Sequence, residues 1–202
     1  MVKSMFNKLT AIATLNANAE VIARNNADRF RRGLDSHLRY GLSRCAHYVK
    51  IALIQGGLSS NNSGINSAKD YGPWLIENNF KAVENVTTVH IGNVFSISGQ
   101  QAGDVVIIQA APRHVHGHMA MFNGTKWVSD FVQDKGFYPA KVYRDNNTAY
   151  TLYRFSEPDS KPNPDNNSDP NEDSLVKNNS INIRYPIPQQ SGQEFAQLED
   201  IL

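Results

Sequence analysis

Three residues that lie far apart in the chain could together carry out nucleophilic catalysis: Cys45, His118 and Asp130. Cys45 is the only cysteine and opens the segment CAHYVKIALIQGG, whose apolar run predicts a buried helix. A thiol at a helix N-terminus lies near free backbone amides, which stabilise a thiolate and can also stabilise an oxyanion. A histidine can take the thiol proton, and a carboxylate can hold the imidazole in one tautomer.

Each of these residues also has a purely structural interpretation. A single cysteine is most often a small buried hydrophobic residue, and only the fold can bring it to a distant histidine. The hairpin HMAMFNGTKWVSDF leaves a further choice. A two-residue loop after Phe122 would place His118 opposite Ser129, whereas a three-residue loop would place it opposite Asp130. We expect an odd-length loop, with Asp130 hydrogen-bonded to one imidazole nitrogen and the Cys45 sulfur facing the other.

The elements that must position these residues follow an α+β order. Residues 1–38 and 44–55 predict helices, the second with Ser43 as N-cap and Gly56-Gly57 as its end. A short helix follows over 68–79, with Ser67 as its cap and a kink or new start at Pro73. Strands are predicted at 103–109, 118–122, 127–132 and 149–155. Helices followed by an antiparallel meander indicate N-terminal helices packed on one sheet.

Composition bounds the remaining organisation. With 20 basic and 19 acidic residues the net charge is +1, which does not indicate nucleic-acid binding, and no stretch is long and apolar enough for membrane insertion. One cysteine cannot form an internal disulfide or a thiolate-rich zinc site. We expect the N-terminal segment to be an amphipathic helix and not a cleaved signal peptide. The predicted organisation is a domain over 1–155, a disordered linker over 156–174, rich in Pro, Asp, Asn and Ser, and a tail over 175–202.

Several aromatic and imidazole side chains are candidates for binding substrate. Tyr71 and Trp74 on the short helix could wall a groove, although such residues usually belong to the core. The segment RHVHGH sets three histidines at alternate positions and would suit a metal on a strand, but the neighbouring Pro112 and Gly117 favour a loop. We therefore predict no metal and no cofactor, with His116 at the edge of the cleft.

Four segments of the chain resemble the CHAP and NlpC superfamily of papain-like peptidoglycan hydrolases. They are LSRCAHYVKIALIQGG, KDYGPWLIENNF, GDVVIIQ and HGHMAMFNGTKWVSDF, and the resemblance spans about residues 9–155. Within the superfamily the chain is most similar to amidase effectors of type VI secretion systems. The polar segment over residues 24–39 is longer than the usual spacer, and the acidic, proline-rich tail is outside the family pattern.

The resemblance implies a cysteine amidase acting on the peptide stems or cross-links of peptidoglycan, with Cys45 as nucleophile and His118 as base. Asp130 stands where the family has a variable third polar residue. Synthesis in the cytoplasm, delivery by secretion machinery, action in a target cell's periplasm and a cognate immunity protein are also implied. Two alternatives remain: a non-catalytic module that binds cell wall or a partner, and a transferase or deamidase that uses the same residues.

Overall fold

The computed structural model describes residues 5–32, 44–61 and 64–157. The predicted cap Ser43, the linker beyond residue 157 and the tail over 175–202 lie outside the described residues, so these expectations stay predictions. Strand β8 (Tyr150–Phe155) ends at the predicted domain boundary. Within the described part, no helix has the length and apolar character needed to cross a bilayer.

The first helix, α1 (Lys8–Arg31), is shorter than the predicted 1–38. Its buried face consists of small and aliphatic residues at helical spacing: Ala11, Leu15, Ala19 and Ile22. Leu9, one of the apolar residues on which the prediction depended, is 70% exposed because it lies off this face. Helix α2 (Cys45–Gln55) packs between α1 and the sheet, and it begins and ends within a residue of its predicted limits.

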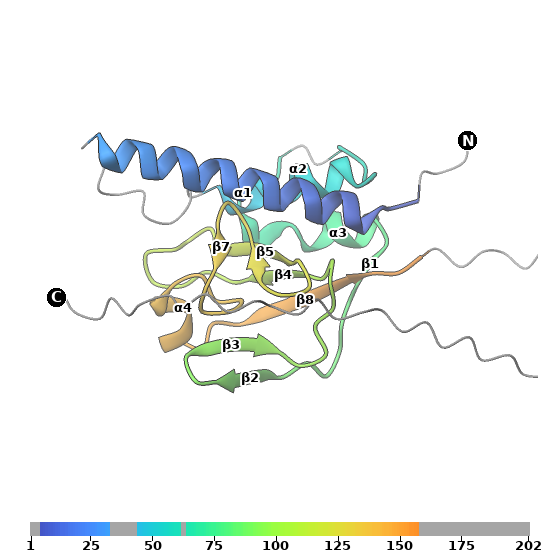
Figure 1. Ribbon diagram of the computed structural model, residues 1–202. Helices are drawn as coiled ribbons and strands as arrows, with labels where there is room; N and C mark the ends of the chain where they lie inside the picture. The colour runs from blue at the N-terminus through green and yellow to red at the C-terminus, as the bar shows by residue number, and fades with distance from the viewer. Residues whose placement is uncertain (1–4, 33–43, 62–63, 158–202) are drawn as a thin grey trace, which may run out of the picture. The chain divides into compact units, whose positions relative to one another are not determined.

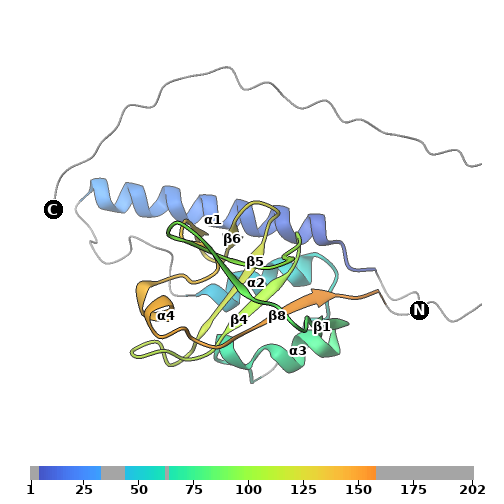
Figure 2. The ribbon, with the colours of Figure 1, turned by 90° about the horizontal axis from the view of Figure 1, so that it is seen from below.

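A 3-10 turn, η1 (Ala68–Asp70), and helix α3 (Gly72–Glu77) occupy the predicted short helical segment. Pro73 lies in the first turn of α3, where its missing N–H leaves no hydrogen bond unmade, so the expected new start is confirmed. Helix α4 (Lys141–Asp145) was not predicted. It lies at the end of the sheet away from α3 (Figures 1 and 2).

The main sheet is antiparallel throughout and has six strands in the order β1-β8-β4-β5-β6-β7. Its members besides β8 are β1 (Phe80–Ala82), β4 (Val105–Ile108), β5 (His118–Phe122), β6 (Trp127–Val128) and β7 (Val132–Gln133). A separate hairpin comprises β2 (Thr88–Ile91) and β3 (Val94–Ile97). Helices α1, α2 and α3 lie on one side of the main sheet and the hairpin on the other (Figure 1).

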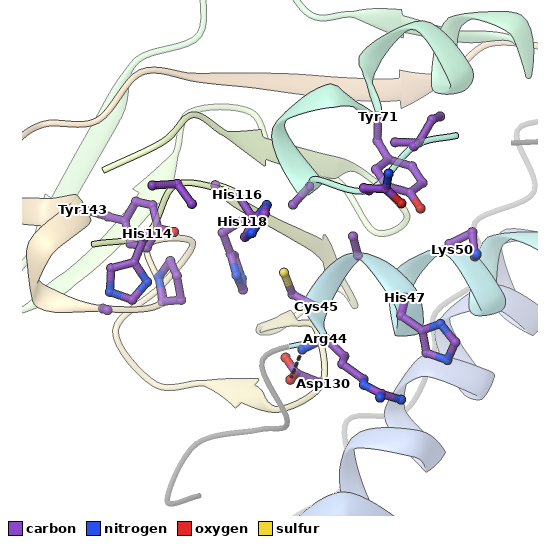
Figure 3. Close-up of a pocket in the computed structure, with 18 of the residues that line it drawn as sticks. Arg44, Cys45, His47, Lys50, Tyr71, His114, His116, His118, Asp130 and Tyr143 are labelled. Carbon is purple, nitrogen blue, oxygen red and sulfur yellow. Dashed lines mark hydrogen bonds between the residues drawn. The ribbon is translucent and has the colours of Figure 1, made fainter. Parts of the chain in front are cut away.

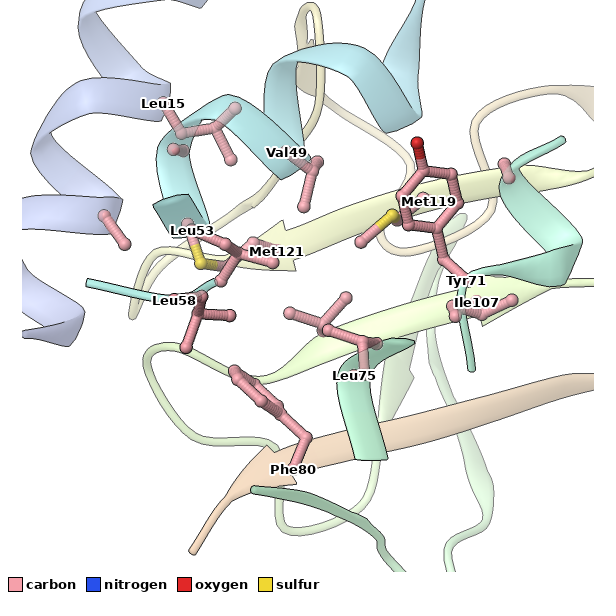
Figure 4. Close-up of a cluster of buried hydrophobic side chains, with 14 of the residues drawn as sticks. Leu15, Val49, Leu53, Leu58, Tyr71, Leu75, Phe80, Ile107, Met119 and Met121 are labelled. Atoms are coloured by element: carbon pink, nitrogen blue, oxygen red, sulfur yellow. The ribbon is translucent and has the colours of Figure 1, made fainter. Parts of the chain in front are cut away.

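Both faces of the central strands are buried, which explains their continuous apolar sequences. Ile107, Met119 and Met121 face the helices and pack with residues such as Leu53 and Leu75 (Figure 4). The alternate residues of the same strands pack on the other face in a second cluster, which includes Ala120, Phe122, Trp127, Phe137 and Tyr143. The predicted α+β class, with helices before an antiparallel meander, is confirmed.

Candidate active site

A pocket of about 760 Å³ opens where the N-terminus of α2 meets the start of β5. Cys45, His118 and Asp130 all line it, although 73 and 12 residues separate them in turn along the chain. Tyr71, from the segment before α3, and Tyr143, from α4, also contribute to its wall. The sequence-predicted residues are therefore brought into one cavity, and Figure 3 shows the Cys45 sulfur pointing toward the His118 ring.

Cys45 is the first residue of α2, and the N-cap Arg44 offers no side-chain cap. Burial raises the pKa of the Cys45 thiol to about 11. Hydrogen bonds from the backbone N–H groups of Met119 and Ala46 oppose this rise, whereas the Asp130 charge adds to it. The thiol is therefore protonated at rest near pH 7, and the surrounding amides are arranged to stabilise a thiolate once it forms.

His118 is 6% exposed, and burial lowers the pKa of its imidazole to about 4. The negative charge of Asp130 opposes this shift, and His114 adds a smaller lowering of the pKa. The imidazole is consequently neutral near pH 7. A neutral thiol beside a neutral imidazole is the resting arrangement in this pocket.

Gln133 is the hydrogen-bond partner of His118, and sequence reasoning missed it. The side-chain amide of Gln133 lies 2.9 Å from Nε2 of His118. The Gln133 side-chain nitrogen donates hydrogen bonds to the backbone oxygens of Gly136 and Phe137, both at 2.9 Å. In this orientation the Gln133 side-chain oxygen accepts a hydrogen bond from Nε2–H of His118. This network places the imidazole proton on Nε2 and leaves Nδ1 with a free lone pair.

The carboxylate of Asp130 accepts hydrogen bonds from the backbone N–H of Arg44 at 3.1 Å and from the Ser129 hydroxyl at 3.1 Å. It thus satisfies a free amide at the start of α2.

The predicted odd-length hairpin loop is wrong: Phe122 pairs with Trp127, so the loop has four residues, 123–126. The expected hydrogen bond to the imidazole is made by Gln133 at Nε2.

The reason for this difference is the point at which β6 stops. The sequence predicted one strand over 127–132, whereas β6 ends at Val128, and residues 129–131 form a tight turn into β7. Gln133 pairs with Trp127, Trp127 pairs with Phe122, and Phe122 lies on the same sheet face as His118. The Ser-Asp pair in the turn is a signal that could have revealed the break.

The predicted substrate-binding residues separate into two groups. Tyr71 and His116 line the pocket, and His116 Nδ1 lies 2.8 Å from the hydroxyl of Ser67, the predicted helix cap. Trp74 is only 2% exposed and belongs to the core cluster under α2, so its assignment to the substrate groove is corrected. Tyr143, which the sequence analysis did not select, is 2% exposed and shares the pocket with His118.

Residues 113–117 of the RHVHGH segment form turns between β4 and β5, and only His118 lies on a strand, so the alternate histidines do not share a sheet face. His116 contacts Ser67, while the ring of His114 lies 5.2 Å from that of Tyr143. Over the described residues, no group of three or more His, Cys, Asp or Glu side chains is arranged to hold a metal ion.

Comparison with known proteins places this arrangement in a family. No protein-family profile and no curated protein sequence matches the chain. Two crystal structures of a type VI effector-immunity complex, Tae3-Tai3 from Ralstonia pickettii, are similar to it. In the native complex, the matched chain is 32% identical in sequence to this chain, with a TM-score of 0.53. The match covers 75% of this chain and 100% of the matched chain. In the selenomethionine form, the matched chain is 34% identical in sequence to this chain, with a TM-score of 0.51. The match covers 72% of this chain and 99% of the matched chain. The fold is papain-like, and the chain belongs to the Tae3 family of type VI effectors.

Proposed function

We propose that this effector is an antibacterial peptidoglycan amidase that cleaves amide bonds in wall peptides through Cys45 and His118. The observation that carries the proposal is the hydrogen bond between Gln133 and Nε2 of His118, because it leaves Nδ1 unprotonated for the thiol. Gln133 thus replaces Asp130 as the proposed orienting residue. The resemblance to CHAP and NlpC hydrolases and the similarity to Tae3 support the choice of peptidoglycan as substrate.

The proposed reaction proceeds in two stages. His118 Nδ1 removes the thiol proton as the Cys45 sulfur attacks the amide carbonyl, and the backbone N–H of Cys45 stabilises the oxyanion. The imidazolium then donates its proton to the leaving amine, which leaves a thioester on Cys45. Water, deprotonated by His118, hydrolyses the thioester and regenerates the thiol. Side chains of the chain carry every proton in these steps, so the proposal includes no cofactor.

The neutral resting pair suits such a mechanism. Proton transfer from Cys45 to His118 creates two charges in a buried site, and the amides of Met119 and Ala46 stabilise the thiolate. The charge of Asp130 favours the protonated imidazole, as its effect on the His118 pKa indicates. Asp130 is therefore proposed to support the imidazolium through its charge and to hold the start of α2.

The proposed setting follows from the relatives. Their structures are effector-immunity complexes, so we propose a cognate immunity protein that blocks the pocket of this chain. Synthesis in the cytoplasm, transfer by the secretion machinery and action in the periplasm of a target cell belong to the same proposal. No step requires nucleic acid or insertion into a membrane.

The first prediction tests catalysis directly. Cys45→Ala should abolish release of products from purified muropeptides while leaving the thermal unfolding midpoint within a few degrees, because alanine preserves the helix and removes the sulfur. Mass spectrometry of the digests identifies the bond that the wild-type protein cuts. Retained cleavage by a folded Cys45→Ala protein would show that another group performs the chemistry.

Two other functions of the same pocket have distinct signatures. A binding module would retain wall peptides without releasing any product, in both the wild-type and the Cys45→Ala protein. A transferase or deamidase would form an acyl-enzyme that depends on an added amine or on a glutamine side chain. Product identity in the presence and absence of an amine acceptor separates these outcomes.

A further inference from the structure

The wall of the pocket is far more basic than the chain as a whole. The complete chain has a net charge of only +1. The lining contains three cations, Arg44, Lys50 and Arg113, and a single carboxylate, Asp130. Because that carboxylate is 2% exposed and accepts hydrogen bonds from Arg44 N–H and Ser129, it lies beneath the surface that a ligand would meet.

Ion pairs involve several of the cations elsewhere on the molecule. Five ion pairs join described residues, and none of them uses a residue of the pocket wall: Asp28–Arg31, Lys69–Asp70, Lys126–Asp134, Lys141–Asp145 and Asp104–Arg154. Within the described part of the chain, the side chains of Arg44, Lys50 and Arg113 form no ion pair and no hydrogen bond. Their positive charge is therefore available to a ligand in the pocket.

The two cations best placed for this purpose come from different elements. Lys50 lies five residues after Cys45 on α2, which corresponds to about 7.5 Å along the helix axis. Arg113 belongs to the turn between β4 and β5, and its φ of 66° is a left-handed conformation that few non-glycine residues adopt. Its neighbour His114 lies on the opposite side of Cys45 from Lys50 (Figure 3).

We infer that the pocket selects acidic peptides, and that Lys50 and Arg113 bind free carboxylates of the substrate on either side of the scissile amide. This inference rests on the proposed function, since it assigns a specificity to the same site. An ammonium and a guanidinium that line a pocket attract a carboxylate more strongly than they would on an open surface. The offset of about 7.5 Å along the helix axis between Cys45 and Lys50 corresponds to roughly two extended residues of about 3.3 Å each, so we assign Lys50 to a carboxylate one or two residues from the scissile bond.

The test uses one set of muropeptides in two forms: with free carboxylates, and with the carboxylates converted to amides by carbodiimide coupling to ammonia. Wild-type protein should cleave the acidic form with about tenfold higher kcat/KM, because two partly exposed pairs are each worth roughly a factor of three to five. This preference should reside mainly in KM and should decline between low and high NaCl concentrations.

Lys50→Gln/Arg113→Gln should reduce the ratio of the two kcat/KM values to about one. The matched control, Lys81→Gln/Lys135→Gln, removes two exposed cations that do not line the pocket and should keep the wild-type ratio. A wild-type protein that cleaves both forms equally, or a Lys50/Arg113 variant that keeps the preference, overturns the inference while the amidase function stands. Failure of the wild-type protein to cleave either form contradicts the proposed function itself.

An acidic partner protein is the competing explanation of the basic wall, and the same variants resolve it. If Lys50→Gln/Arg113→Gln weakens binding of an immunity protein but leaves the ratio between acidic and amidated muropeptides unchanged, the cations serve the partner and the inference is wrong.

Discussion

His118 is a buried histidine whose tautomer is set by neighbouring polar groups. Its Nε2–H is held by the Gln133 amide oxygen, and the Gln133 nitrogen is held by two backbone oxygens. An uncharged amide fixes the tautomer without adding a negative charge, so it leaves the pKa of the imidazole low. Asp130 supplies the charge from another direction, through its position beside the start of α2.

The second prediction separates these two polar residues. Gln133→Ala should lower kcat on the order of 10²-fold, because the imidazole loses the partner that sets its tautomer. Asp130→Asn should lower kcat only a few-fold, since an asparagine oxygen can still accept the Arg44 N–H hydrogen bond. The measurement is steady-state hydrolysis of muropeptides by folded variants. The reverse order of effects would return Asp130 to the orienting role.

The third prediction concerns the Cys45 thiol, whose alkylation by iodoacetamide can be followed without interference from other cysteines. Because burial raises its pKa to about 11, the thiol is protonated below that value, and the alkylation rate should increase roughly tenfold per pH unit from 7 to 10. In denaturant the same thiol should titrate near its ordinary value of about 8.5. Rapid alkylation of the native protein that does not change with pH below 7 would indicate a resting thiolate-imidazolium pair instead.

At the scale of elements, the position of Gln133 depends on a close approach between β3 and the segment after β7. Gly136 pairs with Phe95 in a β-bridge and has a φ of 86°. A Cβ atom at this position would lie 1.8 Å from the backbone oxygen of Phe95. The carbonyl of Gly136 also accepts a hydrogen bond from the Gln133 amide, so the contact with the hairpin β2–β3 helps to position the Gln133 side chain.

The fourth prediction is that Gly136→Ala lowers the free energy of unfolding by at least about 2 kcal/mol, through strained φ and a backbone clash. Hydrolysis should also fall, because the Gln133 network moves with this segment. Gly64→Ala is the matched control: its φ is 89°, but no atom lies within 4 Å of the added Cβ. Urea unfolding of both variants separates the clash from the conformational strain. Equal destabilisation would mean that the close approach to Phe95 contributes nothing.

At the scale of the whole molecule, β8 is the strand that completes the main sheet and its core. This strand pairs with both β1 and β4 and joins the two parts of the sheet. Phe155 at its end stacks against Phe6 and Phe80, with ring centroids 4.8 and 5.6 Å apart, so the strand also ties down the segment before α1. The described core is therefore complete once β8 has formed.

The fifth prediction follows from this role of β8. A chain that ends at Glu157 should keep the melting temperature of the full protein within a few degrees and hydrolyse muropeptides at a similar rate. A chain that ends at Ala149 should fail to fold, because β1 and β4 lose the strand between them. Calorimetry and circular dichroism of the two truncations provide the measurement. Unfolding of the longer truncation would show that residues beyond 157 contribute to the domain.

The sequence by itself determined the features that depend on local pattern. The apolar run after Cys45 predicted α2 to within one residue, and the continuous apolar runs predicted strands β4 and β5. The types of Cys45 and His118 indicated a nucleophile and a base, and both line the pocket. These features follow from side-chain character and periodicity, which act over a few neighbouring residues.

Only the tertiary structure decided the partner of His118. Strand parity predicted Asp130 on the assumption that 127–132 was one strand, but β6 stops at Val128 and the chain turns back. Gln133 reaches the imidazole through pairing across three strands, and its amide is oriented by carbonyls from a segment held against β3. Trp74 fills the core and the unpredicted Tyr143 lines the pocket for the same reason: the place of an aromatic side chain depends on which distant element packs against it.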